Sequence, residues 1–243
     1  MAVERIEYQA GSVKGHGALV YNDTISGKRP LLLIMPNWLG VTETIIKRAA
    51  EMAGDKYVAF VGCMYGEGKT CDGPEEATEW MTNVRRDRVE GRARVNAALN
   101  TMIAEAEKRG IGDASKTAAV GFCFGGGNVL ELARSGAELD AVVCLHGDLA
   151  TTLPAKKGDI KAAIFVLHGT KDPVSGKADR DALEAELDGA EANWQMLDFG
   201  GRLHSFTEEE ANVPGIALYD AGAAHQTYRM LDDFIQDAFS KKL

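Results

Sequence analysis

T-A-A-V-G-F-C-F-G-G-G, residues 117–127, carries the strongest structural signal in this sequence. Its apolar run, 117–122, predicts a buried strand, and residues 128–134 after the glycines have the spacing of a helix. A strand, a tight turn and a helix with a cysteine at the corner form the G-x-[S/C]-x-G nucleophile elbow. Gly121 and Gly125 flank Cys123 at the two positions where a side chain would crowd the turn.

The elbow would hold Cys123 in an unfavourable backbone conformation and lift its sulfur clear of the sheet. The N–H groups and positive dipole end of the next helix would then favour the thiolate. Two other interpretations are an inert cysteine in a glycine-rich turn and a nucleotide-binding loop. The order of the glycines does not match G-x-G-x-x-G, and no Lys-Ser/Thr pair follows, which disfavours the nucleotide-binding loop.

The composition of the 243 residues, 45% of them hydrophobic, is typical of a soluble globular protein. A formal net charge of -9 disfavours nucleic acid and anionic membranes as partners. The first residues, M-A-V-E-R-I-E-Y, do not resemble a signal peptide, and no apolar run approaches the ~20 residues of a membrane span. The four cysteines contain no C-x-x-C pair, so we expect reduced thiols and a cytoplasmic location, with a Cys63–Cys71 disulfide as the alternative.

Predicted strands and helices alternate along most of the chain. Residues 3–9 and 16–22 predict an antiparallel hairpin at a sheet edge. Further strands are predicted at 30–35, 57–61, 117–122, 141–145, 162–167 and 193–197. Helices are predicted from 42 or 43 to 53, from 74 to 109 with Gly91 as a candidate break, at 178–187 and at 222–239. The pattern predicts a single α/β domain over residues 1–243, with a mostly parallel sheet of about eight strands and helices on both faces.

Three chemically reactive side chains follow predicted strands in the order nucleophile, acid, histidine. Cys123, Asp172 and His204 each lie just past a strand, where the loops of a parallel sheet carry working residues. A thiol nucleophile needs a base, and the base needs a third group that orients it. Taken singly, Asp172 could be a turn or helix-cap residue, and His204, after a Gly-Gly turn, a surface residue of a mobile, exposed loop. Together they predict a catalytic triad.

Other histidines and aspartates are weaker candidates. His146 and His168 follow apolar strands and are expected to be structural, although His146 could line the pocket. His225 lies in the last predicted helix. Asp148 comes too soon after the elbow to serve as the acid, whereas Asp198 is a genuine second choice.

Acyl transfer also requires donors for an oxyanion. The backbone N–H of Phe124, the residue after the nucleophile, is expected to be one donor, and that of Trp38 the other. No metal site or cofactor is expected, because the sequence holds no H-E-x-x-H motif or Cys/His cluster. The acidic run at 208–210 is interpreted as a helix start or a solvated loop.

Together, G-F-C-F-G-G-G, H-G-T-K-D-P and H-S-F resemble the dienelactone hydrolase family of the α/β-hydrolase superfamily. The resemblance extends over L-L-L-I-M-P-N-W-L-G, M-Y-G-E-G and the final helix, so it covers nearly the whole chain. It implies a domain without a cap, with Cys123, Asp172 and His204 as the triad. It also implies hydrolysis of an ester or lactone through an acyl-cysteine in the cytosol.

Three positions depart from the members that cleave dienelactones. Those members carry a glutamate before the oxyanion residue, where this chain has Asn37. They use two arginines for the substrate carboxylate, where this chain has Glu67 and Glu208. Because glutamate repels a carboxylate that arginine would bind, neutral small esters or lactones are the expected substrates. Arginines that could compensate are Arg85, Arg86 and Arg202.

The sequence therefore predicts a dienelactone hydrolase-like ester or lactone hydrolase that is a monomer or a weak homodimer. The predicted substrate pocket comprises Asn37, Tyr65, Glu67, Trp80, Val174, Phe206 and Glu208. Alternatives are a thioesterase or acyltransferase with the same triad, or a non-catalytic thiol sensor on a hydrolase scaffold, since an accessible thiolate is readily oxidised.

Overall fold

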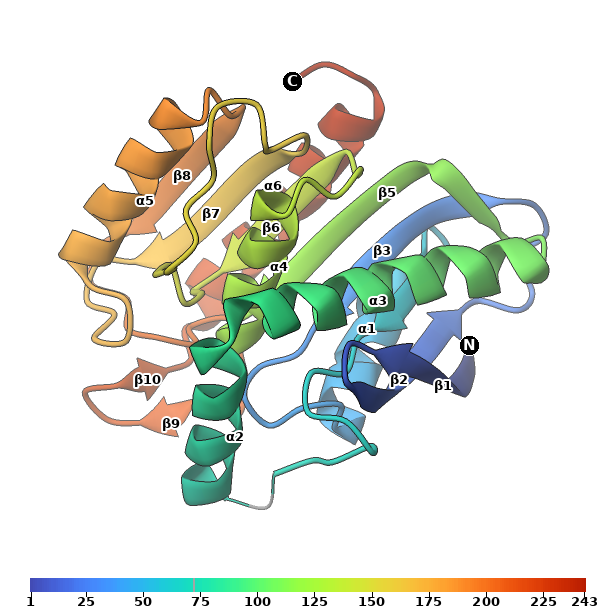
Figure 1. Cartoon of the computed structure of the whole chain (residues 1–243), viewed down its shortest axis with the longest axis horizontal. Coiled ribbons are helices and arrows are strands. Elements are labelled where there is room, and N and C mark those ends of the chain that lie inside the picture. The colour runs from blue at the N-terminus through green and yellow to red at the C-terminus, as the bar shows by residue number, and fades with distance from the viewer. Residues whose placement is uncertain (72) are drawn as a thin grey trace. The chain divides into compact units, whose positions relative to one another are not determined.

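The structure is a computed structural model that describes residues 1–71 and 73–243 (Figure 1). The chain divides into two compact units, Met1–Ala119 and Val120–Leu243. Strand β5 (Gly112–Phe122) runs through the division and ends at the predicted elbow. The prediction of one domain over residues 1–243 stays a prediction, as does the oligomeric state.

The first unit is built on an antiparallel hairpin and two parallel strands. β1 (Ala2–Ala10) and β2 (Val13–Tyr21) pair in register from Ala2 opposite Tyr21 to Ala10 opposite Val13, as the alternation predicted. β3 (Arg29–Met35) pairs in parallel with β4 (Val58–Val61), and both consist almost wholly of buried residues. The strands are accompanied by three helices, α1 (Glu43–Ala53), α2 (Pro74–Arg86) and α3 (Arg88–Lys108).

The long helical region breaks at Asp87, so the expected break at Gly91 is wrong. The Asp87 side chain accepts a hydrogen bond of 2.9 Å from the Glu90 N–H and thereby caps the start of α3. Asp, unlike Gly, has an oxygen that can satisfy a helix's first N–H groups. Gly91 lies inside α3, where it is buried.

The second unit holds three parallel strands and their helices. β6 (Ala141–Leu145), β7 (Ala163–Gly169) and β8 (Trp194–Phe199) pair side by side in parallel. In Figure 1, α4 (Phe124–Arg134) and α5 (Lys177–Gly189) lie in front of these strands, and α6 (Ala221–Phe239) lies behind them. A small hairpin of β9 (Asn212–Val213) and β10 (Ala217–Leu218) was not predicted.

The main sheet has eight strands in the order β1-β2-β4-β3-β5-β6-β7-β8. This arrangement confirms the predicted α/β class and mostly parallel sheet. No helix of residues 1–71 and 73–243 is long and apolar enough to cross a membrane. Cys63, Cys71, Cys123 and Cys144 form no disulfide with one another, so the alternative of a Cys63–Cys71 disulfide is not realised.

Candidate active site

Cys123 lies at a strained corner between β5 and α4. Its backbone has φ 53° and ψ −116°, a region that residues with a side chain rarely adopt. A Cβ atom on Gly121 would overlap the carbonyl oxygen of Gly125, so the turn closes only because residue 121 is glycine. Gly121, which the sequence places two residues before Cys123, therefore has a steric role.

Backbone hydrogen bonds hold the corner from the β6 side. The Cys123 N–H donates to the Leu145 carbonyl at 3.1 Å, and the Cys123 carbonyl accepts from the Asp148 N–H at 3.2 Å. Next along the chain, Gly126 approaches the backbone of Gly147 so closely that a Cβ on it would lie 2.7 Å from the Gly147 Cα. Segment 145–148 is thus hydrogen-bonded to both the N–H and the carbonyl of Cys123.

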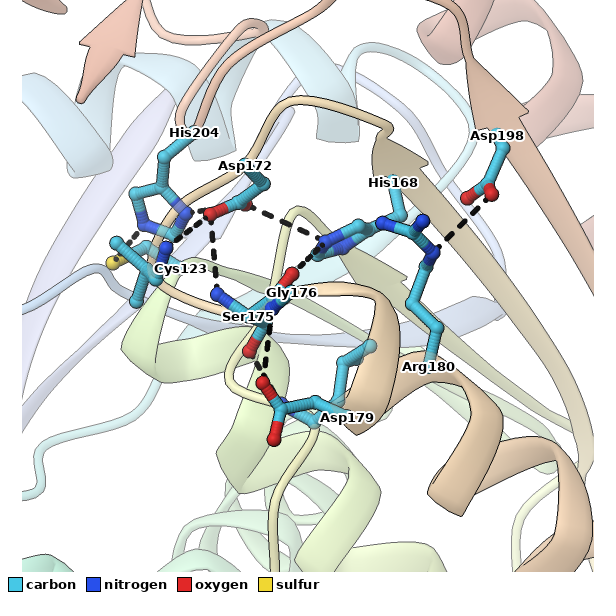
Figure 2. Close-up of polar contacts among 11 residues, drawn as sticks. Cys123, His168, Asp172, Ser175, Gly176, Asp179, Arg180, Asp198 and His204 are labelled. Atoms are coloured by element: carbon cyan, nitrogen blue, oxygen red, sulfur yellow. Dashed lines mark hydrogen bonds and ion pairs between the residues drawn. The ribbon is translucent and has the colours of Figure 1, made fainter. Parts of the chain in front are cut away.

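His204 joins Cys123 to Asp172 in a continuous line (Figure 2). His204 Nε2 lies 2.9 Å from Cys123 Sγ, and His204 Nδ1 lies 2.7 Å from Asp172 Oδ2. All three side chains are buried or nearly so. Because a carboxylate can only accept, Nδ1–H donates to Asp172, which turns Nε2 toward the sulfur. The structure thus brings together the three side chains that the sequence put in order.

The Asp172 carboxylate is buried and surrounded by donors. Its Oδ1 accepts from the backbone N–H groups of Val174 at 2.7 Å and Ser175 at 3.2 Å. His168 Nε2 donates to the Ser175 carbonyl at 2.8 Å and lies 3.6 Å from Asp172 Oδ2. Burial lowers the pKa of His168, although the neighbouring Asp172 acts in the opposite direction. His168 thus lies directly against Asp172, and the expectation that it is structural stays a prediction.

The electrostatics favour a charged imidazole. Burial by itself would lower the pKa of His204, but the negative charge of Cys123 and the hydrogen bonds to Asp172 and Cys123 outweigh it. The net effect raises the pKa of His204 well above its usual range. A protonated His204 beside the sulfur is the arrangement that stabilises a thiolate.

His204 is held in a tightly packed loop. Its side chain is only 6% exposed, so the expectation of an exposed loop is wrong. The His204 N–H donates to the Ile216 carbonyl and its own carbonyl accepts from the Leu218 N–H, both at 3.1 Å. These bonds attach the loop to the β9–β10 hairpin, whose exposed two-residue strands left no periodic pattern in the sequence.

The other candidates occupy different surroundings. Asp198, the second choice as acid, forms an ion pair with Arg180 at 3.2 Å. Asp148 is buried, and its backbone supports Cys123. His225 is exposed on α6. His146 is fully buried, and its ring lies 5.6 Å from that of His204 in a T-shaped arrangement.

The pocket residues predicted in the second unit differ in exposure. Val174, next to the acid, is 43% exposed, whereas Phe206 is fully buried and packs against the His146 and Phe199 rings. Glu208 is also buried, unlike its exposed neighbours 209 and 210. The interpretation of 208–210 as a solvated run is therefore wrong at Glu208, because the turn from Ser205 to Glu208 folds it inward. That these three side chains contact substrate stays a prediction.

Two of the predicted residues of the first unit make hydrogen bonds within or to the loop after β3. Asn37 Oδ1 accepts from the Leu39 N–H at 3.0 Å, and the Tyr65 hydroxyl donates to the Trp38 carbonyl at 2.8 Å. The Tyr65 ring also meets Trp80 edge to face at 5.4 Å. Glu67 has φ 53° and forms an exposed ion pair with Lys69 at 3.1 Å. The roles of Trp38 and Phe124 in an oxyanion hole stay predictions.

The arginines that could compensate for Glu67 and Glu208 have other contacts. Arg202 lies 3.0 Å from Asp220 in an ion pair. Arg85 contacts the Met81 sulfur at 3.9 Å within α2, and Arg86 is exposed. Among residues 1–71 and 73–243, no group of three or more His, Cys, Asp or Glu side chains could hold a metal ion.

Proteins of known family and known structure resemble this chain over most of its length. The model of the dienelactone hydrolase family matches residues 17–239. The chain belongs to the dienelactone hydrolase family. The solved structure of m3DLH is 31% identical, with a TM-score of 0.90, and the match covers 98% of each chain. P91, described as a dienelactone hydrolase-like promiscuous phosphotriesterase from metagenomic libraries, is 30% identical, with a TM-score of 0.88 and the same coverage.

A curated relative from Caenorhabditis elegans, the uncharacterised protein K02A2.1, is 30% identical over 165 residues. That match covers 66% of this chain and all of the relative. Membership of the dienelactone hydrolase family and the likeness to m3DLH and P91 identify this chain as a hydrolase acting on ester bonds.

Proposed function

We propose that this member of the dienelactone hydrolase family hydrolyses small neutral carboxylic esters or lactones through an acyl-cysteine intermediate. The observation that carries the proposal is the unbroken line from Cys123 Sγ through both ring nitrogens of His204 to Asp172, with spacings of 2.9 and 2.7 Å. Nucleophile, base and orienting acid in hydrogen-bond contact are what covalent catalysis requires.

The reaction begins from a Cys123 thiolate and a protonated His204. The sulfur attacks the carbonyl carbon, and the electron pair of the C=O bond moves to the oxygen. When the tetrahedral intermediate collapses, the bond to the leaving oxygen breaks and His204 Nε2 gives that oxygen its proton. The products of this half-reaction are an alcohol, an acyl-cysteine and a neutral His204.

Neutral His204 then takes a proton from a water molecule, whose oxygen attacks the acyl carbon. The C–S bond breaks, the carboxylic acid leaves, and the thiolate and protonated imidazole are restored. Asp172 stabilises the imidazolium throughout and does not itself take a proton. The backbone N–H of Phe124 is proposed as one donor to the oxyanion, and the sequence pattern proposes that of Trp38 as the other.

The preference for neutral substrates follows from the charges of three residues. Asn37, Glu67 and Glu208 stand where dienelactone-cleaving relatives are expected to carry a glutamate and two arginines. Glu67 is paired with Lys69, and neither Glu67 nor Glu208 has the chemistry of an arginine that binds a carboxylate. An anionic substrate would find no compensating charge at these positions.

Substrate preference can be tested with one neutral and one anionic substrate. We expect kcat/KM for a neutral aryl acetate to exceed that for an anionic dienelactone. A matched variant, Glu208→Gln, removes one negative charge with little change in shape. It is expected to reduce the difference in kcat/KM between the two substrates. A wild-type enzyme that prefers the dienelactone would refute the assignment of neutral substrates.

The nucleophile can be tested independently of substrate identity. Cys123→Ala is expected to abolish ester turnover, and His204→Ala to reduce it strongly. Intact mass spectrometry during turnover of a slow ester should show one acyl group added to the wild type and none to Cys123→Ala. An acyl group on a different residue would refute the acyl-cysteine step.

Two further substrate classes belong in the same assay. Thioesters and alternative acyl acceptors test a thioesterase or transferase with the same triad. Phosphotriesters are included because P91, 30% identical to this chain, is described as a phosphotriesterase. A wild type inactive on the whole panel, with Cys123 readily oxidised by peroxide, would instead favour the thiol sensor.

A further inference from the structure

His146 is a buried histidine at the end of β6 to which the proposed reaction assigns no proton transfer. Its side chain has no solvent exposure, and its Nε2 lies 2.7 Å from the Thr207 hydroxyl, three residues beyond His204. Its ring centroid lies 5.6 Å from that of His204 and 5.4 Å from that of Phe206, and both ring pairs are T-shaped. One side chain thus contacts the catalytic imidazole and two of the next three residues of its loop.

The backbone around His146 is attached to the nucleophile. Leu145 accepts a hydrogen bond from the Cys123 N–H, and the Asp148 N–H donates to the Cys123 carbonyl. The His146 N–H donates to the Leu167 carbonyl of β7 at 2.8 Å. His146 therefore lies on a segment fixed to the Cys123 peptide, while its side chain is fixed to the loop that carries His204.

Three non-glycine residues around Cys123 and His204 have strained backbone conformations. Cys123 and Ser205 have φ 53°, and His146 has φ 38°. A non-glycine residue in this region costs roughly 1–3 kcal/mol and persists only where surrounding contacts over-determine it. Strain therefore occurs in the nucleophile, beside the base and at the residue that contacts both segments, which indicates that side-chain direction matters at all three.

We infer that His146 is a positioning residue that sets the distance between Cys123 and His204 by binding Thr207 and packing against the His204 ring. It transfers no proton. This inference rests on the proposed function, since the distance it sets is that between the nucleophile and its base. An error of about 1 Å in such a distance costs on the order of 100-fold in rate.

Matched substitutions of Thr207 isolate the hydrogen bond. Thr207→Val keeps the shape and removes the hydroxyl, whereas Thr207→Ser keeps the hydroxyl and removes a methyl group. We expect Thr207→Val to lower kcat about 10- to 100-fold with KM unchanged, and Thr207→Ser to stay near wild type. Equal kcat values for the two variants would overturn the inference.

His146→Phe removes the same bond from the other side and keeps an aromatic ring against His204. Because both substitutions break one interaction, the double variant His146→Phe/Thr207→Val should lose no more activity than the more affected single variant. Losses that multiply would show that the two residues act separately and would overturn the inference.

A control separates positioning from loss of stability. Thr227 on α6 is fully buried, and its hydroxyl has no hydrogen-bond partner in the described part of the chain. Thr227→Val should leave kcat unchanged. A kcat that falls in step with Tm in all these variants would indicate a structural role for His146 and would contradict the inference.

Two readouts need no ester turnover and so remain valid if the proposed function fails. NMR titration should show a lower pKa of His204 in Thr207→Val than in Thr207→Ser, because the imidazole moves away from the thiolate. Alkylation of Cys123 by iodoacetamide at neutral pH should slow in Thr207→Val alone. If neither differs between these variants, His146 does not position His204, whatever the substrate.

Discussion

The corner at Cys123 and the loop at His204 reach their geometry in opposite ways. Around Cys123 the turn itself depends on a local contact, the approach of Gly121 to the backbone of Gly125, although segment 145–148 adds hydrogen bonds. Around His204 they come from residues distant in the chain, including Asp172 and His146. A local corner is encoded in five residues, whereas a base held by distant segments can be displaced without touching the histidine itself.

The largest effect on stability is expected from adding a side chain at Gly121, in the turn before Cys123. In Gly121→Ala the added methyl group would overlap the Gly125 carbonyl, a backbone atom that cannot move aside, so we expect loss of soluble protein or a large drop in Tm. Gly189→Ala is the control, because its Cβ would meet nothing within 4 Å, and about 0.4–1 kcal/mol of stabilisation is expected. Thermal unfolding of both variants measures the difference, and a folded, active Gly121→Ala would contradict the steric account.

A smaller but still severe effect is expected from neutralising the acid. Asp172→Asn keeps the shape but offers an amide to His204 Nδ1, which favours the wrong tautomer, and kcat should fall on the order of 10³-fold. The fold should survive, since the amide oxygen can still accept from the Val174 and Ser175 N–H groups. Steady-state kinetics with a neutral ester, alongside circular dichroism, tests this expectation. A loss of less than tenfold would argue against Asp172 as the orienting acid.

The charge on the Cys123 sulfur should affect the pKa of His204. In Cys123→Ser a neutral hydroxyl replaces the thiolate, so burial and Asp172 remain while the main influence that raises the pKa of His204 disappears. The pKa of His204 should therefore fall, and the ring should lose its proton at a lower pH than in the wild type. NMR titration of the imidazole measures both values. Identical titrations would mean that the wild-type sulfur is a neutral thiol.

The smallest effect is expected at the rival acid. Asp198 forms an ion pair with Arg180 and is 38% exposed, so Asp198→Asn should cost at most about 1 kcal/mol in stability. Its kcat/KM should equal that of the wild type, in contrast to Asp172→Asn. Kinetics and Tm of the two asparagine variants, measured together, sharpen the comparison. A large loss of activity in Asp198→Asn would reopen the choice of acid.

Much of the molecule could be predicted from short-range patterns. The alternation in the first 22 residues predicted the β1–β2 hairpin. Apolar runs predicted the strands from β3 to β8 to within two residues, except that β5 begins at Gly112, five residues before the predicted start. The spacing of glycines around Cys123 predicted the turn between β5 and α4. Each of these features depends on periodicity or steric clash within a few neighbouring residues, which a sequence displays directly.

Features that depend on contacts between distant segments were predicted poorly or missed. The burial of His204 and Glu208 was not expected, and neither was the contact of His146 with the His204 ring. The helix break at Asp87 was assigned to Gly91, because glycine is the commoner breaker and the capping role of an aspartate shows only once the two helices are placed.

The sequence by itself determined the succession of strands and helices along the chain, the cysteine at the corner and the order Cys123, Asp172, His204. Only the tertiary structure decided that His204 Nε2 lies 2.9 Å from the sulfur and that Asp172, rather than Asp198, contacts Nδ1. The reason is physical. Periodicity and steric exclusion act over a few residues, whereas the direction of a loop side chain is set by the packing and hydrogen bonds of segments that meet only when the chain has folded.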